Sequence, residues 1–429
     1  MNGAHDDETV RSASDEGARR AVAAVWRIES AKIVATLTRM VGDFGYAEDL
    51  AQEALLDALR QWPVDGVPRN GAAWLTAVAK RKAVDGWRRR ERLDDRLAVL
   101  AHDLEREHAE AADAPPWDPD AVDDDVLRLI FISCHPVLSR EAQVALTLRV
   151  VGGLTSEQIA RAFLVPTATV QQRIVRAKKT LAAAHVSFEM PSRDEHRERL
   201  GGILGVLYLI FNEGHAASSG ADWMRPELSL EAIRLARVLV ALLPRERDAR
   251  SLLALMELTA ARFPARADAD GQPILLADQD RGRWDRGRIA RGRAELAAAD
   301  AIGPGRGAFG LQAAIAERHA VAPSVEETDW EQIVLLYEAL GRIAPSPVVE
   351  LNRAAAVAMA TGPASALLLI DRLSASGALN GYHLLPATRG EMLLRLGRDA
   401  EARSEFAVAA ALAGNDRERA LLQAKADGD

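Results

Sequence analysis

The side chains best suited to chemistry lie between Ser156 and Lys179, in the segment SEQIARAFLVPTATVQQRIVRAKK. Gln and Arg can read base edges in a DNA major groove, and Thr, Arg and Lys can bind phosphates. The candidates for this chemistry are Thr169, Gln171, Gln172, Arg173, Arg176 and Lys178. Their spacing places them on the exposed side of one helix, and a basic helix of this kind predicts DNA reading.

Two helices joined by a tight turn are needed to position these residues. Apolar residues at helical spacing predict a short first helix, and Leu164 to Pro166 breaks it because proline cannot donate a backbone N–H. Thr167 or Thr169 is expected to cap the second helix, which should bury Val170 and Ile174. An ordinary amphipathic hairpin on a surface is the alternative for this segment alone.

Composition predicts an almost entirely helical protein. The chain has 429 residues, about three domains by size, with 48% apolar residues and no stretch of β-type alternation. Cys134 is the single cysteine, which argues against a disulfide framework or a cysteine-based zinc site and favours a reducing cytoplasm. The polar N-terminus lacks a signal-peptide core, and the apolar stretch 201–211 is too short to span a bilayer.

Charge is distributed unevenly, although the net charge is −8. Seven basic residues fall between Lys80 and Arg92, whereas residues 101–125 contain ten acids and one base, Arg106. Such an acidic, Pro-containing segment cannot bury enough apolar surface to fold alone. It is therefore expected to be a linker between a first helical domain and the helix-turn-helix domain.

The first domain is predicted to contain three helices. The first should run from Gly17 to Val41 with Ile28 on its apolar side, and Gly42 to Tyr46 should break it. The second, AEDLAQEALLDALRQW, should bury Leu50, Ala54, Leu55 and Leu59 and expose Glu48, Asp49, Gln52, Glu53 and Asp57. A loop over 62–71 precedes the last helix, in which Trp74 is expected to belong to the core.

Two segments of the chain resemble a known family. YAEDLAQEALLDALRQW with AAWLTAVAKRKAVDGWRRRER resembles region two of bacterial sigma factors of the extracytoplasmic-function class. LSREAQVALTLRVVGGLTSEQIARAFLVPTATVQQRIVRAKKTL resembles their region four. The resemblance covers about residues 15–185. It implies a region-two domain over 15–97, an acidic linker over 98–125 and a region-four domain over 126–188.

The resemblance also implies partners and contact residues. Core RNA polymerase would contact Asp49, Gln52 and Glu53 on the second helix. The minus-ten element would contact Arg69 and Asn70 in the loop and the basic residues Lys80, Arg81, Lys82, Arg88, Arg89 and Arg90. The minus-thirty-five element would contact the six candidates of the helix-turn-helix. Gln171 stands where the family often has a basic residue, and Gln prefers adenine, so the promoter is expected to depart from the commonest motif.

The remaining part, about residues 195–429, is predicted to be a stack of helical hairpins. LLRLGRDAEARSEFAVAAAL, from Leu393 to Leu412, resembles a tetratricopeptide repeat, and Gly362 precedes Gly397 by 35 residues, close to that repeat's period. Stacked hairpins form an α-solenoid with a binding groove. The whole chain thus resembles a sigma-factor subgroup with such an extension, which is expected to carry a protein or small-molecule regulator.

Polar clusters at 211–215 and at 278–281 with 284–285 were the other candidates for chemistry. Glu and His can bind zinc or move protons, but no HExxH pair and no nucleotide fingerprint occurs. Helix termination and carboxylate–Arg pairs explain these clusters better, so we expect no cofactor, no metal and no enzymatic activity. A promoter-specificity subunit is the preferred function. The alternatives are a ligand-responsive helix-turn-helix regulator that acts without core polymerase, and an enzyme or scaffold based in the C-terminal half.

Overall fold

The structure is a computed structural model that describes residues 3–90, 119–163, 165–186, 188–189, 191, 193–217, 223–268 and 271–428. For residues 3–15, 86–90, 119–124, 161, 193–194, 196 and 198 only the backbone is described. The regular secondary structure of these residues is helical, apart from one isolated β-bridge between Ala267 and Pro273, and turns and loops connect the helices. The chain forms two compact units, residues 1–206 and 207–429. The all-α fold class expected from composition is confirmed.

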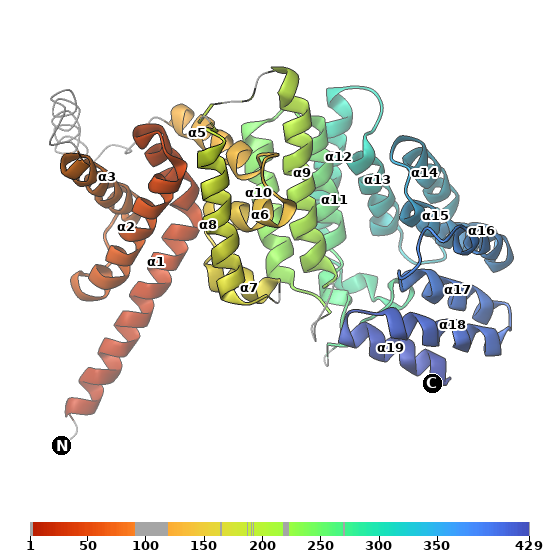
Figure 1. Cartoon of the computed structure of the whole chain (residues 1–429). Helices are drawn as coiled ribbons and strands as arrows, with labels where there is room; N and C mark the ends of the chain where they lie inside the picture. The colour runs from red at the N-terminus through yellow and green to blue at the C-terminus, as the bar shows by residue number, and fades with distance from the viewer. Residues whose placement is uncertain are drawn as a thin grey trace. The chain divides into compact units, whose positions relative to one another are not determined.

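Unit 1 contains the two segments that resemble sigma factors. Its helices are α1 (Gly3–Val41), α2 (Phe44–Asp65), α3 (Gly71–Arg90), α5 (Pro119–Ser133), α6 (Arg140–Leu146), the π-helical turn η1 (Thr147–Val151), α7 (Ser156–Ala162), α8 (Thr167–Ala183) and the first part of α9 (Arg193–His215). They are coloured from red to yellow-green in Figure 1.

Helices α1 and α2 form a hairpin whose turn is set by two residues. Gly42, at φ +70°, ends α1, and the Asp43 side chain accepts a 2.7 Å hydrogen bond from the Tyr46 N–H to cap α2. Trp26 and Leu37 lie on the buried face of α1, whereas Ile28 is 65% exposed. The expectation that Ile28 lies on the apolar side was therefore wrong, because the helical period places it on the opposite face from Trp26.

The second helix also exposes one residue that was expected in the core. Leu50 and Ala54 are buried, but Leu59 is 37% exposed near the end of α2. Glu48, which was expected in solvent, is instead buried. Glu48 is buried because it pairs with Arg149 and Lys178, which are distant in sequence.

Helix α5 begins inside the segment expected to be a linker. It starts at Pro119, and Asp125 near its middle is fully buried, 3.0 Å from Arg39 of α1 and 2.6 Å from Arg128. These ion pairs let a carboxylate enter the interior next to α1. The expectation of an unstructured linker up to Asp125 was thus wrong at its C-terminal end, and residues 91–118 lie outside the described part of the chain.

Close contact between α1 and the turn before α7 requires a glycine. Gly153 has φ +69°, and a Cβ at this position would lie 2.7 Å from Ser30 Oγ and 3.3 Å from the Arg27 Cα. Any other side chain would push the turn away from α1. Together with the contacts of α1 with α5 and η1, this joins the two sigma-like segments into one compact unit.

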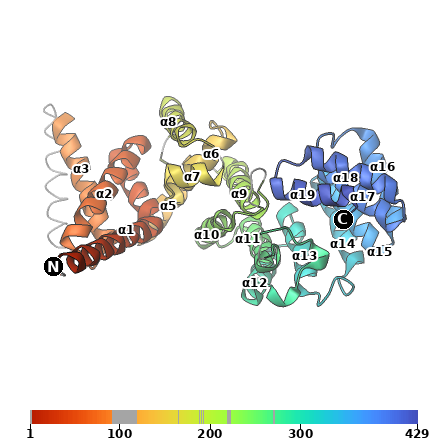
Figure 2. The ribbon, with the colours of Figure 1, turned by 90° about the horizontal axis from the view of Figure 1, so that it is seen from below.

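Unit 2 is a succession of antiparallel helices. Its elements after α9 are α10 (Pro226–Leu242), α11 (Arg247–Ala260), η2 (Phe263–Ala265), η3 (Leu276–Asp278), η4 (Arg281–Arg283), α12 (Arg286–Ile302), α13 (Ala308–Val321), α14 (Trp330–Ile343), α15 (Pro347–Ala360), α16 (Pro363–Ser376), α17 (Leu384–Arg395), α18 (Asp399–Leu412) and α19 (Asp416–Asp427). From α10 onwards each α-helix packs against the next, as Figures 1 and 2 show for this unit. The expected α-solenoid is confirmed as an arrangement of helical hairpins.

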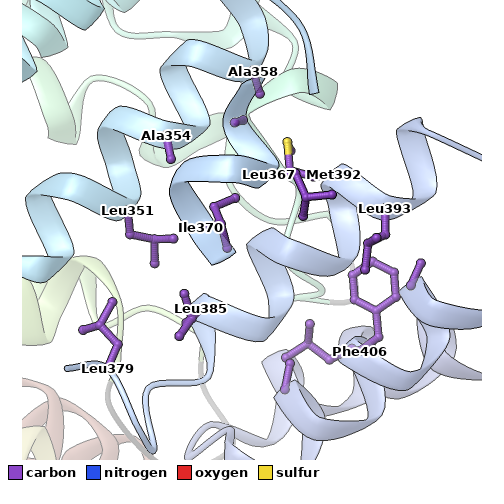
Figure 3. Packing of buried hydrophobic residues seen from close by; sticks show 14 of the residues in the cluster. Leu351, Ala354, Ala358, Leu367, Ile370, Leu379, Leu385, Met392, Leu393 and Phe406 are labelled. Carbon is purple, nitrogen blue, oxygen red and sulfur yellow. The ribbon is translucent and has the colours of Figure 1, made fainter. Parts of the chain in front are cut away.

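The last hairpins share one core. Leu351 and Ile370 from α15 and α16 meet Leu393 and Phe406 from α17 and α18, and all four are buried (Figure 3). Gly390 lies under the Phe406 ring, where a Cβ would come within 2.9 Å of a ring carbon. Small residues therefore let neighbouring helices approach, as in other hairpin stacks.

The glycines spaced by 35 residues occupy matching turns. Gly362 (φ +108°) precedes α16, and Gly397 (φ +73°) precedes α18, so both enter the second helix of a hairpin. Their positive φ angles explain why glycine recurs at this period. Whether these hairpins are tetratricopeptide repeats stays a proposal.

Candidate nucleic-acid interface

The helix-turn-helix is built by local capping. The Thr155 N–H donates to Gln158 Oε1 at 2.8 Å, and the Gln158 N–H donates to Thr155 Oγ1 at 3.2 Å, which starts α7 with a capping box. Pro166 precedes α8 and no side chain caps that helix. The expectation that Thr167 or Thr169 caps α8 was therefore wrong, since Pro166 already fixes the backbone at its start.

One face of α8 is buried and the other presents the predicted base-reading residues. Val170 and Ile174 are buried as expected, together with Ala177 and Leu181. Gln171, Gln172 and Arg176 are exposed, whereas Thr169 and Arg173 are half-buried. Exposed amides and a guanidinium on one helix suit contacts with base edges and phosphates, and their DNA-binding roles remain predictions.

Lys178 differs from the other candidates because its ammonium group is engaged inside the protein. It forms ion pairs with Glu48 and, at 2.8 Å, with Asp49, and only 16% of its side chain is exposed. Burial lowers the pKa of Lys178, but Glu48 and Asp49 outweigh burial and raise it. In this conformation Lys178 is not available to a phosphate.

Glu48 is the centre of this cluster. Its side chain is 5% exposed, and it also lies 3.4 Å from the Arg149 guanidinium of η1. The cluster thereby joins α2 of the region-two segment to η1 and α8 of the region-four segment. Sequence reasoning missed Glu48 and Arg149, since no local signal indicates that residues about 100 positions apart meet.

The predicted polymerase-binding residues are only partly open. Asp49 and Glu53 are exposed on α2, and Gln52 is half-buried. Asp49 already contacts Lys178, and Glu53 lies 3.3 Å from Lys82. Two residues expected to bind polymerase are thus paired with two residues expected to bind DNA.

Lys82 is held by a second carboxylate as well. Its ammonium lies 2.9 Å from Asp57, and this hydrogen bond is the main cause of a raised Lys82 pKa. Of its predicted partners in phosphate binding, Arg81 is exposed and Lys80 is half-buried. Arg88, Arg89 and Arg90 belong to α3, but their side chains lie outside those that the structure describes.

The loop predicted to contact the minus-ten element is shorter than expected. Helix α2 continues through Trp62 and Pro63 to Asp65, so the expected loop over 62–71 was wrong in its first half. Trp62 is buried, because it packs beneath Gly71 and edge-on against Trp74, at 5.6 Å between ring centroids. This aromatic packing stabilises the extra helical turn.

Arg69 and Asn70 are both exposed in this short loop. Asn70 Oδ1 accepts a 3.0 Å hydrogen bond from the Ala73 N–H and so caps α3. The cap fixes the direction in which the loop enters the helix. Both residues stay predicted DNA contacts.

The polar clusters of unit 2 serve local structure. Glu213 pairs with Arg225, and Asp280 and Asp285 cap η4 and α12 by accepting from the N–H groups of Gly282 and Arg288. Asp278 ends η3. Across the described residues, no group of three or more His, Cys, Asp or Glu side chains could hold a metal ion.

A helical domain with an acidic second helix and a basic third helix, followed by a helix-turn-helix domain, defines the sigma type of transcription initiation factor. Residues 28–93 match the family described as sigma-70 region 2, and residues 128–181 match sigma-70 region 4. Residues 199–300 match a family of unknown function, DUF6596. The chain belongs to the sigma-70 family, in the extracytoplasmic-function class, and carries a C-terminal extension.

Curated relatives match either most of the chain or its sigma-like part. The chain is 42% identical over 405 residues to an uncharacterized protein of Rhizobium meliloti (strain 1021), and this alignment covers 91% of this chain and 92% of the relative. It is 32% identical over 170 residues to a probable ECF RNA polymerase sigma factor, SigI, of Mycobacterium tuberculosis, covering 39% of this chain and 56% of that protein. No solved structure matches the chain. No helix in the described residues is long and apolar enough to cross a membrane.

Proposed function

We propose that the chain is a promoter-specificity subunit that binds core RNA polymerase, recognises and opens promoters and directs transcription initiation. It works by binding rather than by catalysis, and its C-terminal helical unit regulates it. The observation that carries the proposal is that Gln171, Gln172 and Arg176 are exposed on α8. The same chain also presents an acidic face on α2.

The ion pairs of Glu48 support a closed conformation of the free chain. Lys178 and Asp49 are 2.8 Å apart, yet one is predicted to contact DNA and the other polymerase. Promoter elements about 25 base pairs apart are separated by about 85 Å, at 3.4 Å per base pair. Regions two and four must therefore separate when the chain engages both elements, and polymerase would compete with Lys178 for Asp49.

The decisive experiment is in vitro transcription from the DNA upstream of the chain's own gene, with purified core polymerase and the full chain. We expect a specific transcript only when both proteins are present. Duplex DNA binding that is equally specific without core polymerase, with no transcript, would instead favour a ligand-responsive helix-turn-helix regulator.

A charge reversal tests the polymerase surface. Glu53→Arg should weaken binding to core polymerase, because it replaces an exposed acid at the centre of the proposed face. Asp65→Arg makes the same charge change at the exposed end of the same helix and serves as the matched control. Equal affinities of the two variants for core polymerase would reject this surface.

A further inference from the structure

Unit 2 contains a cavity of about 730 Å³ between its middle and its last helices. Its walls include apolar and aromatic side chains, among them Trp330, Ile333 and Tyr337 of α14, Ala356 of α15 and Met392 of α17. A volume of this size and a mostly apolar lining are typical of sites for small organic molecules. The polar groups that line such a site determine the class of ligand.

Arg281, from η4, is a buried guanidinium in the cavity wall. It is 8% exposed, and it donates to the carbonyl oxygens of His319 and Ala322 at 2.8 and 2.7 Å and to Thr328 Oγ1 at 3.2 Å. A guanidinium has five N–H donors, so about two remain without a partner among the described residues. These neutral oxygens and the Trp284 ring, whose centroid lies 4.8 Å from the guanidinium carbon, hold the group in place, and the exposed Glu326 is the carboxylate that acts on its charge.

Two more arginines, the buried Arg266 and the half-buried Arg262, add to this positive charge. The pKa of Arg262 is lowered to about 10, mainly by burial and secondly by the positive charge of Arg281. The pKa of Arg266 is lowered to about 9, mainly by burial and secondly by the positive charge of Arg262. Both remain protonated at neutral pH. Arg266 lies over the Trp223 ring and donates to the His215 carbonyl oxygen. In the described part of the chain, none of the three arginines forms an ion pair with a carboxylate.

The surrounding histidines do not supply compensating charge either. Burial, followed by Arg262 and Arg281, lowers the pKa of His319 to about 3, so this ring in the cavity wall is neutral. His319 Nδ1 and Trp223 Nε1 are buried and have no hydrogen-bond partner among the described residues. A buried cation normally has an opposite charge nearby, because desolvation otherwise makes its burial costly.

The other charged side chains that line the cavity are two cations and four carboxylates. Lys425 pairs with Glu391, Glu418 lies 3.0 Å from His383, and Arg395 contacts the Met359 sulfur at 3.2 Å. The remaining two lining acids are Asp278 and Glu326, which are both exposed, and Glu326 is close enough to Arg281 to raise the pKa of the guanidinium. Burial still outweighs Glu326 and lowers the Arg281 pKa, so the buried charge of the cavity wall is that of Arg281, with Arg262 and Arg266 near it.

We propose that this cavity binds a small organic anion, with its carboxylate or phosphate group at Arg281 and its apolar body against Trp330 and Tyr337. The anion would place a negative charge inside the cavity, where none of the three arginines has an ion-pair partner among the described residues, and it would accept hydrogen bonds from the unpartnered N–H donors in the wall. Binding to unit 2 stands without the proposed role in transcription; only its meaning as a regulatory signal rests on that role.

The test uses two fluorescent probes with almost the same apolar body. The anion 8-anilinonaphthalene-1-sulfonate and the neutral N-phenyl-1-naphthylamine are titrated into the full chain. We expect saturable binding of one sulfonate probe per chain, with an affinity at least about tenfold higher than that of the neutral probe.

Two substitutions remove the charge preference in different ways. Arg281→Gln should weaken sulfonate binding at least about tenfold, with Arg372→Gln on the exposed surface of α16 as its matched control. Asn352→Asp adds one negative charge to an exposed residue of the cavity wall and should also weaken binding of the sulfonate probe. Asn380→Asp, outside the cavity, is its matched control. Circular dichroism checks folding, and Asn352→Asp keeps the test valid if Arg281→Gln unfolds.

Each outcome decides the proposal. Loss of sulfonate binding in Arg281→Gln or Asn352→Asp, with binding of the neutral probe unchanged, supports it. The absence of saturable sulfonate binding, or equal losses for both probes, overturns it and leaves an apolar groove. Where sulfonate binding supports the proposal, displacement of this probe by benzoate or by inorganic phosphate identifies the preferred head group. None of these results depends on transcription, so a failed promoter assay and a failed binding assay are distinguishable.

Discussion

The ion pairs around Glu48 should determine whether regions two and four stay together in the free chain. Lys178→Met removes one of the two cations that contact Glu48, whose side chain is 5% exposed. Breaking a buried ion pair costs about 3–5 kcal/mol, but Arg149 remains 3.4 Å away, so we expect Lys178→Met to destabilise the closed conformation by about 2 kcal/mol. This shifts the closed-to-open equilibrium roughly 30-fold toward open.

The assay is a double-mutant cycle of Glu48→Gln and Lys178→Met in the full chain. Fluorophores on cysteines placed at the exposed residues Arg81 and Thr180 report the separation of α3 and α8 by energy transfer during a urea titration. Urea leaves ionic strength constant, so surface screening does not confound the coupling. The buried Cys134 should not react.

Lys179→Met is the matched control, because the adjacent lysine carries the same charge but is exposed. It should change the opening equilibrium by less than about 0.5 kcal/mol. A coupling between positions 48 and 178 below about 0.3 kcal/mol would refute the reasoning, as would an equal effect of Lys179→Met. Lys178→Met should also strengthen binding to core polymerase, since less free energy is needed to expose Asp49.

Three further predictions concern separate parts of the chain. Phe406→Ala should destabilise the last hairpins by about 3–5 kcal/mol, because it leaves a cavity in their shared core; hydrogen exchange in α17 to α19 measures this stability. Leu368→Ala, at a side chain that is 63% exposed, should change the same stability by less than about 0.5 kcal/mol. The His319 pKa is about 3 in the folded chain and about 6.5 when unfolded, so the unfolded state binds the extra proton and stability falls as pH falls through this window. Between pH 7 and 5 the free energy of unfolding should fall by about 2 kcal/mol because of His319, and His319→Phe should remove this part of the pH dependence. If urea unfolding of His319→Phe shows the same pH dependence as the parent chain, His319 is not a buried neutral ring. Gln171→Ala should relax base preference in the upstream element without changing core binding, and an equal loss on every promoter variant would argue against base reading.

The sequence determined the elements whose signals are local. Apolar residues at helical spacing placed Val170 and Ile174 on the buried face of α8, and Gly362 and Gly397 marked two equivalent turns. The resemblance of two segments to sigma regions two and four also indicated the family, because each region occupies one continuous segment of the chain. Boundaries were less accurate: α2 continues past Pro63, and α5 starts at Pro119 within the acidic segment.

Only the tertiary structure decided which charged residues are available. Asp49 and Lys178 have the sequence context of solvent-exposed residues, yet they meet across 129 positions of the chain. Arg262, Arg266 and Arg281 look like ordinary surface arginines in sequence, and only folding brings them near one another, with Arg266 and Arg281 buried and Arg281 in the wall of a cavity. Hydrophobic periodicity reports which face of a helix is apolar, whereas burial and charge pairing depend on which other helix covers that face, and this is set by packing between distant segments.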